Sequence, residues 1–155
     1  MSREVEPAPR ISTPAPAWTL GALGLIPFAA ASGVYALGEP RYGGPALLAL
    51  VTYAAAILSF LGGVRWGAEI LRTDRPRWLT LGASNVAPLI GWGLLAAPFA
   101  TAPLQLSGFI AAFLGQWLWD QSSSHLPPWY ARLRTLLTLG ACLALGVALE
   151  RALDG

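Results

Sequence analysis

Residues 42–65 read YGGPALLALVTYAAAILSFLGGVR, and this stretch decides the fold. It has no charged side chain before Arg65 closes it. A helix needs about 20 predominantly apolar residues to cross a hydrocarbon layer about 30 Å thick. The stretch is therefore long enough for one membrane-spanning helix, and its Ala, Leu and Gly content favours helix over strand.

The rest of the chain repeats this pattern. Residues 78–119 carry no charge for 42 residues, which suits two spans separated by a break between Pro98 and Pro103. The last apolar run reaches spanning length if its helix starts near Trp129. We predict five spans, at about residues 17–37, 45–70, 78–97, 103–120 and 129–150.

Composition excludes a water-soluble domain. Hydrophobic residues make up 55% of the 155 residues, charged residues make up 12%, and the mean hydropathy is +0.54. So few polar groups cannot cover the surface of a soluble protein of this size. We therefore predict an all-α, polytopic integral membrane protein, a bundle of five transmembrane helices.

The N-terminal residues differ from the spans. Residues 1–16 contain four prolines and balanced charges, which predicts a short disordered cytoplasmic tail. An alternative is that the first apolar run is a signal peptide cut after Ala31. The length of the run and of the tail before it disfavours this alternative.

All ten basic residues are arginines, and their distribution predicts the orientation. With five spans, eight lie on one side of the membrane, and only Arg41 and Arg151 lie on the other. Loops rich in arginine and lysine remain on the cytoplasmic side of the membrane. We therefore expect a bacterial inner-membrane protein with a cytoplasmic N-terminus and a periplasmic C-terminus. Six tryptophans at the Arg-rich ends of the spans are expected to be interfacial anchors: Trp18, Trp66, Trp78, Trp117, Trp119 and Trp129.

Polar side chains gather at the Arg-rich ends of the second, third and fourth spans: Arg65, Glu69, Ser84, Asn85, Gln116 and Asp120. Arg65 and Asp120 are expected to pair, because either charge alone is costly near hydrocarbon. One interpretation is a structural clip, with Asn85 and Gln116 forming interhelical hydrogen bonds. The other is a recessed site for a lipid headgroup, a quinone or a side chain of a partner.

Two further expectations concern individual helices. Pro27 and Pro88 lie inside the first and third spans and should kink them, with neighbouring groups satisfying the freed carbonyls. Arg132 and Arg134 lie near the start of the fifth span and should snorkel to the interface.

Several functions are disfavoured by what the sequence lacks. With one cysteine, Cys142, and one histidine, His125, neither a metal site nor a cofactor is expected. The middle of each span has no Asp, Glu, Lys, Arg or His, which argues against a proton relay. No basic face suited to nucleic acid is evident. We expect a protein that is not an enzyme.

The segment Phe60-Leu61-Gly62-Gly63-Val64-Arg65-Trp66-Gly67 is similar to a motif of a known family. With Asp120 and Leu133-Arg134 further along, the chain resembles a domain-of-unknown-function membrane family that includes eukaryotic transmembrane protein 69. The resemblance implies a five-helix inner-membrane protein and adds weight to Arg65, Trp66 and Asp120. It implies no particular activity.

Two functions are compatible with these features. The first is a non-enzymatic accessory or assembly subunit of a larger inner-membrane complex, surrounded by membrane lipids. The alternative is a binding protein for an anionic lipid or a quinone at the cytoplasmic ends of the second to fourth spans.

The predicted orientation is testable with reporter fusions at Gly155. A periplasmic C-terminus should make an alkaline phosphatase fusion active and a green fluorescent protein fusion dark. The reverse result would contradict both the orientation and the odd number of spans.

Overall fold

The computed structural model describes residues 15–72, 75–97, 101–122 and 128–154. Its seven helices are α1 (Ala15–Leu23), α2 (Ile26–Leu37), α3 (Pro40–Ile70), α4 (Trp78–Ser84), α5 (Val86–Ala96), α6 (Ala102–Gln121) and α7 (Pro128–Leu153). The predicted tail lies outside the described residues, apart from residues 15 and 16, which begin α1. The loop that holds His125 also lies outside them.

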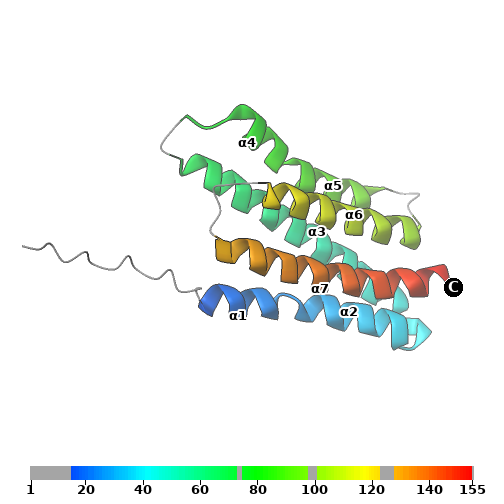
Figure 1. The fold of residues 1–155 in the computed structure, drawn as a ribbon. Helices are drawn as coiled ribbons and strands as arrows, with labels where there is room; N and C mark the ends of the chain where they lie inside the picture. Colours follow the sequence, from blue (N-terminus) through cyan, green and yellow to red (C-terminus); the bar gives the residue numbers. More distant parts are fainter. Residues whose placement is uncertain (1–14, 73–74, 98–100, 123–127, 155) are drawn as a thin grey trace, which may run out of the picture.

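The helices form five rods, because α1 continues into α2 and α4 into α5 (Figure 1). Four rods are long and apolar enough to cross a membrane: residues 15–37, 40–70, 78–96 and 129–153. The fifth, α6, has 20 residues, or about 30 Å of helix. Its hydropathy is reduced by Gln116 and Asp120, both of which are buried inside the bundle. The prediction of an all-α, multi-pass membrane protein with five helical rods is confirmed.

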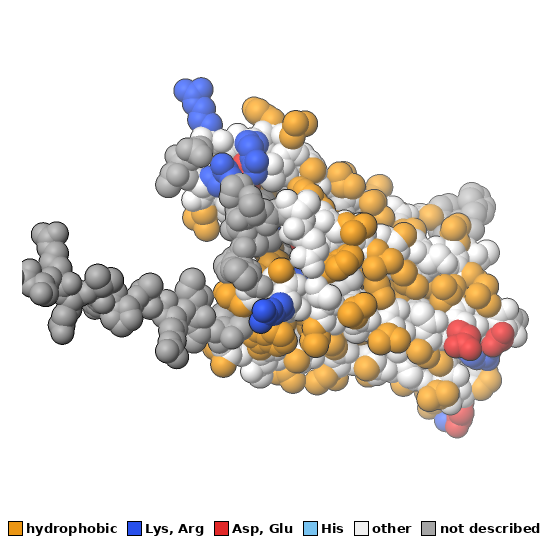
Figure 2. Space-filling view, in the orientation of Figure 1, with side chains coloured by type: hydrophobic (Ala, Val, Ile, Leu, Met, Phe, Trp, Pro, Cys, Tyr) orange, Lys and Arg blue, Asp and Glu red, His pale blue; other side chains and the backbone are white. Residues whose placement is uncertain are grey.

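Consecutive rods run in opposite directions, so the described chain starts at one end of the bundle and finishes at the other (Figure 1). One end holds the start of α1, the end of α3, the start of α4, the end of α6 and the start of α7. We call it the Arg-rich end. Charged side chains visible in Figure 2 lie at the two ends, with a hydrophobic band between them. This distribution fits a bundle whose middle faces lipid.

Both prolines distort their rods as expected. The first rod breaks at Gly24 and Leu25, just before Pro27, and the Tyr53 hydroxyl on α3 donates to the Gly24 carbonyl at 2.9 Å. The third rod breaks at Asn85, three residues before Pro88. At the first break, a neighbouring helix thus satisfies a carbonyl that the interrupted helix leaves free.

The core is centred on α3, which packs against α2, α5 and α6. Its largest fully buried apolar side chains come from α3, α6 and α7: Leu50, Leu58, Leu106, Phe109, Phe113 and Leu145. Phe28 of α2 joins them, with its ring centroid 5.8 Å from that of Phe113 and edge-on to it. The core therefore fixes the lengthwise position of α3 relative to the other rods.

Gly62 permits the closest approach between α3 and the third rod. A Cβ atom at this position would lie 2.5 Å from the Ser84 carbonyl oxygen and 2.7 Å from Pro88 Cγ. The adjacent Gly63 has open space around the same position. Of these two glycines, only Gly62 is required by the packing.

These neighbouring glycines make a matched pair of variants. Gly62→Ala should destabilise the protein by about 1–3 kcal/mol, because backbone on the third rod must move to admit the methyl group. Gly63→Ala should be neutral or slightly stabilising, since Ala is the better helix former. Thermal unfolding in detergent measures both, and equal losses would show that the contact at Gly62 is not tight.

Candidate functional site at the Arg-rich end

The Asp120 carboxylate lies between two guanidinium groups. Arg65 Nε on α3 lies 3.2 Å from Asp120 Oδ1, and Arg134 Nε on α7 donates to Oδ2 at 2.8 Å. All three residues are buried, with exposed fractions of 7%, 6% and 4% for Arg65, Asp120 and Arg134. We call these residues the Asp120 network. It joins α3 to the consecutive helices α6 and α7.

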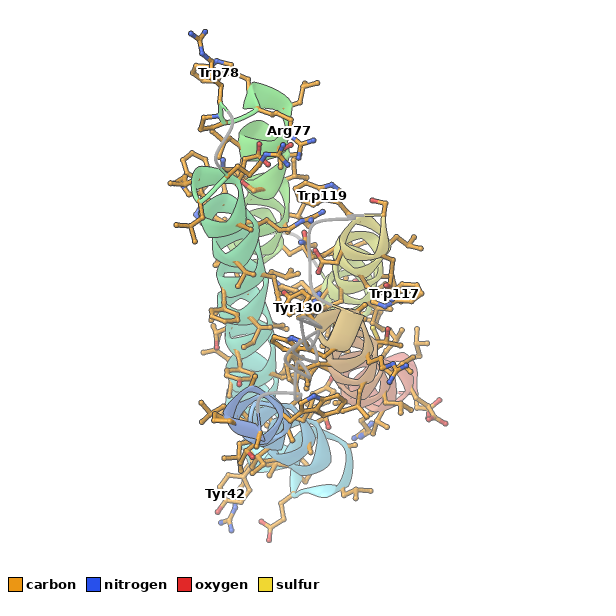
Figure 3. The ribbon with its side chains drawn as sticks, turned by 60° about the vertical axis from the view of Figure 1, so that its left-hand side comes forward. Tyr42, Arg77, Trp78, Trp117, Trp119 and Tyr130 are labelled. Atoms are coloured by element: carbon orange, nitrogen blue, oxygen red, sulfur yellow. The ribbon has the colours of Figure 1, made fainter. Side chains whose placement is uncertain are left out.

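Neighbouring groups hold the network in place. Gln116 Nε2, one turn before Asp120 on α6, donates to Oδ1 at 3.3 Å. Arg65 Nη2 donates to the Trp119 carbonyl at 2.9 Å, and its guanidinium carbon lies 4.1 Å from the centre of the Trp119 ring. Figure 3 shows Trp119 and Tyr130 between α3 and the α6–α7 pair. Arg65 therefore combines an ion pair, a hydrogen bond and a cation–π contact.

The two arginines of the network lie well inside their helices, whereas Asp120 is one residue before the end of α6. Arg65 is five residues before the end of α3, and Arg134 is six residues after the start of α7. At 1.5 Å per residue these positions are about 8–9 Å from the helix ends. A charge at this depth destabilises the protein unless it is paired with an opposite charge. Truncating one partner is therefore destabilising, because it leaves the other charge buried and unpaired.

The network carries one more positive charge than negative. Two guanidiniums share one carboxylate, and Arg134 Nη2 is buried without a hydrogen-bond partner. A buried donor that makes no hydrogen bond is costly in an apolar medium. The described part of this network therefore leaves one cationic donor uncompensated.

A cavity of 380 Å³ adjoins the network, and Arg134 is one of the residues that line it. Side chains from α1, α2, α3, α6 and α7 line it, and nearly all of them are aliphatic or aromatic. Arg134 lines its polar end, together with Trp129 and Tyr130. An apolar cavity with a few converging polar groups is the usual form of a small-molecule site. Guanidinium groups bind anions and carbonyl oxygens, so this arrangement suits recognition of a headgroup.

Glu69 belongs to a separate cluster. Its carboxylate accepts hydrogen bonds from the backbone nitrogen, Nε and Nη2 of Arg77, at 2.9, 3.0 and 3.0 Å. Arg72 Nε also lies 3.7 Å from Glu69 Oε1. The side-chain hydrogen bond to Glu69 raises the pKa of Arg77 above its ordinary value. This cluster ties the start of α4 to the end of α3.

The sequence predictions for the polar residues are met in part. Arg65 and Asp120 do come together, whereas Gln116 bonds to Asp120 within its own helix and not across helices as expected. Ser84 and Asn85 do not join them, because their side chains donate to the Leu81 carbonyl of their own helix, at 2.7 and 2.8 Å. The prediction that Asn85 forms an interhelical hydrogen bond is therefore wrong. The break before Pro88 offers Asn85 a nearer acceptor within its own rod.

Arg134 was not among the predicted site residues. Snorkelling was expected for it, and this prediction was wrong because Asp120 holds its side chain inside the bundle. The neighbouring Arg132 is exposed. Arg134, Thr138 and Ala141 share one face of α7 at i, i+4 and i+7, and all three are buried, but their spacing alone does not mark this face as the inward one.

The tryptophans at this end have different environments. Trp66 and Trp78 are exposed, as interfacial anchors would be. Trp117 Nε1 donates to Thr135 Oγ1 at 3.0 Å and so connects α6 to α7. Trp119 contacts Arg65, and Trp129 lines the cavity. Trp18 is half-buried, and its Nε1 has no hydrogen-bond partner.

The described residues contain no group of three or more His, Cys, Asp or Glu residues that could hold a metal ion. The half-buried Cys142 is a free thiol.

Comparisons with known proteins agree with the sequence resemblance. A family described as "Protein of unknown function (DUF3429)" matches residues 13–150. Transmembrane protein 69 of Xenopus tropicalis is 38% identical over 136 residues, which cover 85% of this chain and 53% of the relative. Transmembrane protein 69 of Mus musculus is 28% identical over 144 residues, covering 90% and 57%. The chain thus spans about half the length of these curated relatives. No solved structure matches it.

The network predicts a definite order of stability losses. Asp120→Ala strands two buried guanidiniums and should cost the most, about 3–5 kcal/mol. Arg65→Ala or Arg134→Ala leaves Asp120 one partner and should cost less. Thermal unfolding in detergent measures the order, with the exposed Arg132→Ala as the control. A loss for Asp120→Ala no larger than for Arg132→Ala would contradict the network.

Proposed function

This chain belongs to the DUF3429 family, and we propose that it is a multi-pass membrane protein that binds a membrane amphiphile. The headgroup lies against Arg134 in the Asp120 network, and the chain of the amphiphile fills the adjoining cavity. One observation carries the proposal: Arg134, whose buried Nη2 has no hydrogen-bond partner among the described residues, lines a mostly apolar cavity.

A purely structural role explains the network less well. One arginine would be enough to neutralise Asp120 and to clip α6 to a neighbouring helix. A second buried guanidinium adds a desolvation cost that a single carboxylate does not offset. A headgroup that accepts a hydrogen bond from Arg134 would offset this desolvation cost. Ligand binding would therefore explain why a second arginine is buried here.

The position of the cavity also supports an amphiphile. Its lining is apolar, and it lies in the part of the bundle whose outer faces meet lipid. A ligand with a polar head and an apolar chain matches both ends of this space. Of the two sequence hypotheses, these features favour a binding protein for an anionic lipid or a quinone.

A second candidate function is an accessory or assembly subunit of a larger membrane complex. A groove of 480 Å³ lies between the third rod and α6, and six of the ten residues that line it are Gly or Ala. Small residues let a neighbouring transmembrane helix approach closely. The proposed occupant of this groove is a transmembrane helix of a partner protein.

The proposed setting is the bacterial inner membrane, with the N-terminus in the cytoplasm, because the arginines concentrate at one end. In both candidate functions the protein acts by binding and not by catalysis.

The test is purification from native membranes in a mild detergent, followed by native mass spectrometry. The wild-type protein should retain one amphiphile per chain. Arg134→Gln should lose it, whereas Arg132→Gln, which changes an exposed arginine on the same helix, should keep it.

A second pair of variants tests the cavity without changing any charge. Val64 lines the cavity, so Val64→Trp should displace the amphiphile by filling the space. The neighbouring Gly63→Trp adds the same side chain where the structure has open space, and should retain the ligand. A stoichiometric protein partner without any bound amphiphile would favour the accessory-subunit function instead.

A further inference from the structure

The charge and size of the site narrow the class of ligand. Building on the proposed function, we infer that the ligand is a single-chain amphiphile whose headgroup carries one negative charge. A long-chain carboxylate is the simplest such molecule. The inference rests on the charge of the Asp120 network, its free donor and the size of the cavity.

The charge of the network calls for a monoanion. Arg65 and Arg134 contribute two positive charges, and Asp120 contributes one negative charge. Glu69 does not neutralise the surplus, because both of its carboxylate oxygens accept hydrogen bonds from Arg77. One further negative charge makes the site neutral, whereas a neutral quinone would leave the surplus in place.

Arg134 combines a donor that has no partner among the described residues with a place in the lining of the cavity. Arg134 uses Nε to reach Asp120, and its buried Nη2 remains without a partner while the side chain lines the cavity. A hydrogen bond from a guanidinium to an anionic oxygen is about twice as strong as one between neutral groups. The donor on Arg134 therefore favours an acceptor with negative charge.

The cavity has room for one chain. Its 380 Å³ is near the lower limit of small-molecule sites, which span roughly 300–1,000 Å³. The apolar lining continues from Arg134 to Ala141, seven residues further along α7 and so about 10 Å away. A diacyl lipid would have to leave its second chain outside. The dimensions therefore favour a single-chain amphiphile.

The experiment uses the delipidated full-length protein in a neutral detergent and four probes: hexadecanoate, hexadecanol, a short-chain ubiquinone and phosphatidylglycerol. Binding is measured by native mass spectrometry and by the rise in melting temperature, which any ligand specific for the folded state must produce. Hexadecanoate should bind once per chain and roughly 10–100-fold more tightly than hexadecanol, as expected for a hydrogen bond to a charged group.

Two variants separate the headgroup from the cavity. Arg134→Gln leaves Arg65 and Asp120 as a balanced pair, so it should fold and should bind hexadecanoate no better than hexadecanol. Val64→Trp should weaken every probe, while Arg132→Gln and Gly63→Trp should behave as wild type. Preserved selectivity for hexadecanoate in Arg134→Gln would overturn the inference.

The outcomes distinguish this inference from the proposed function. Equal binding of hexadecanoate, hexadecanol and ubiquinone would leave the proposed function intact and overturn the inference about charge. Tighter binding of phosphatidylglycerol than of hexadecanoate, at one molecule per chain, would overturn the single-chain ligand. Failure of all four probes to bind would overturn both.

Discussion

The structure depends on one carboxylate that is shared by two guanidiniums in a place that water reaches poorly. Asp120 is on α6, and its partners Arg65 and Arg134 are on α3 and α7. In an apolar medium an unpaired charge is much more costly than it is in water. The three helices therefore have a strong energetic reason to keep one relative position. Dispersion contacts between apolar faces would define that position less sharply.

Close packing elsewhere makes this arrangement possible. Gly62 lets the third rod lie against α3 only one turn of helix away from Arg65. On the other side of the network, Trp117 donates to Thr135 and holds α6 next to α7. Small residues and interhelical hydrogen bonds of this kind are what stabilises helix pairs in lipid, where the hydrophobic effect between helices is absent. The network is thus positioned from both sides.

The Asp120 network has one guanidinium more than its single carboxylate can neutralise, and this imbalance links its stability to the proposed function. A second buried guanidinium with a free donor is a cost that the described residues alone do not offset. Because Arg134 also lines an apolar cavity, the headgroup that we propose would supply the missing partner, with its chain in that cavity. The same groups that fix three helices would then select the ligand by its charge.

The sequence by itself determined the class of the protein and part of its site. Long uncharged runs require a membrane. Arg65 and Asp120 lie at the ends of such runs and were expected to pair, because a single unpaired charge near hydrocarbon has a high free-energy cost. Only the tertiary structure decided that Arg134 points inward, that Asn85 bonds within its own rod, and that a cavity adjoins the network. The physical reason is that a helix with apolar side chains on nearly all faces has no preferred inward face in its sequence. Its rotation is set by the neighbours against which it packs, and these are known only when the bundle is assembled.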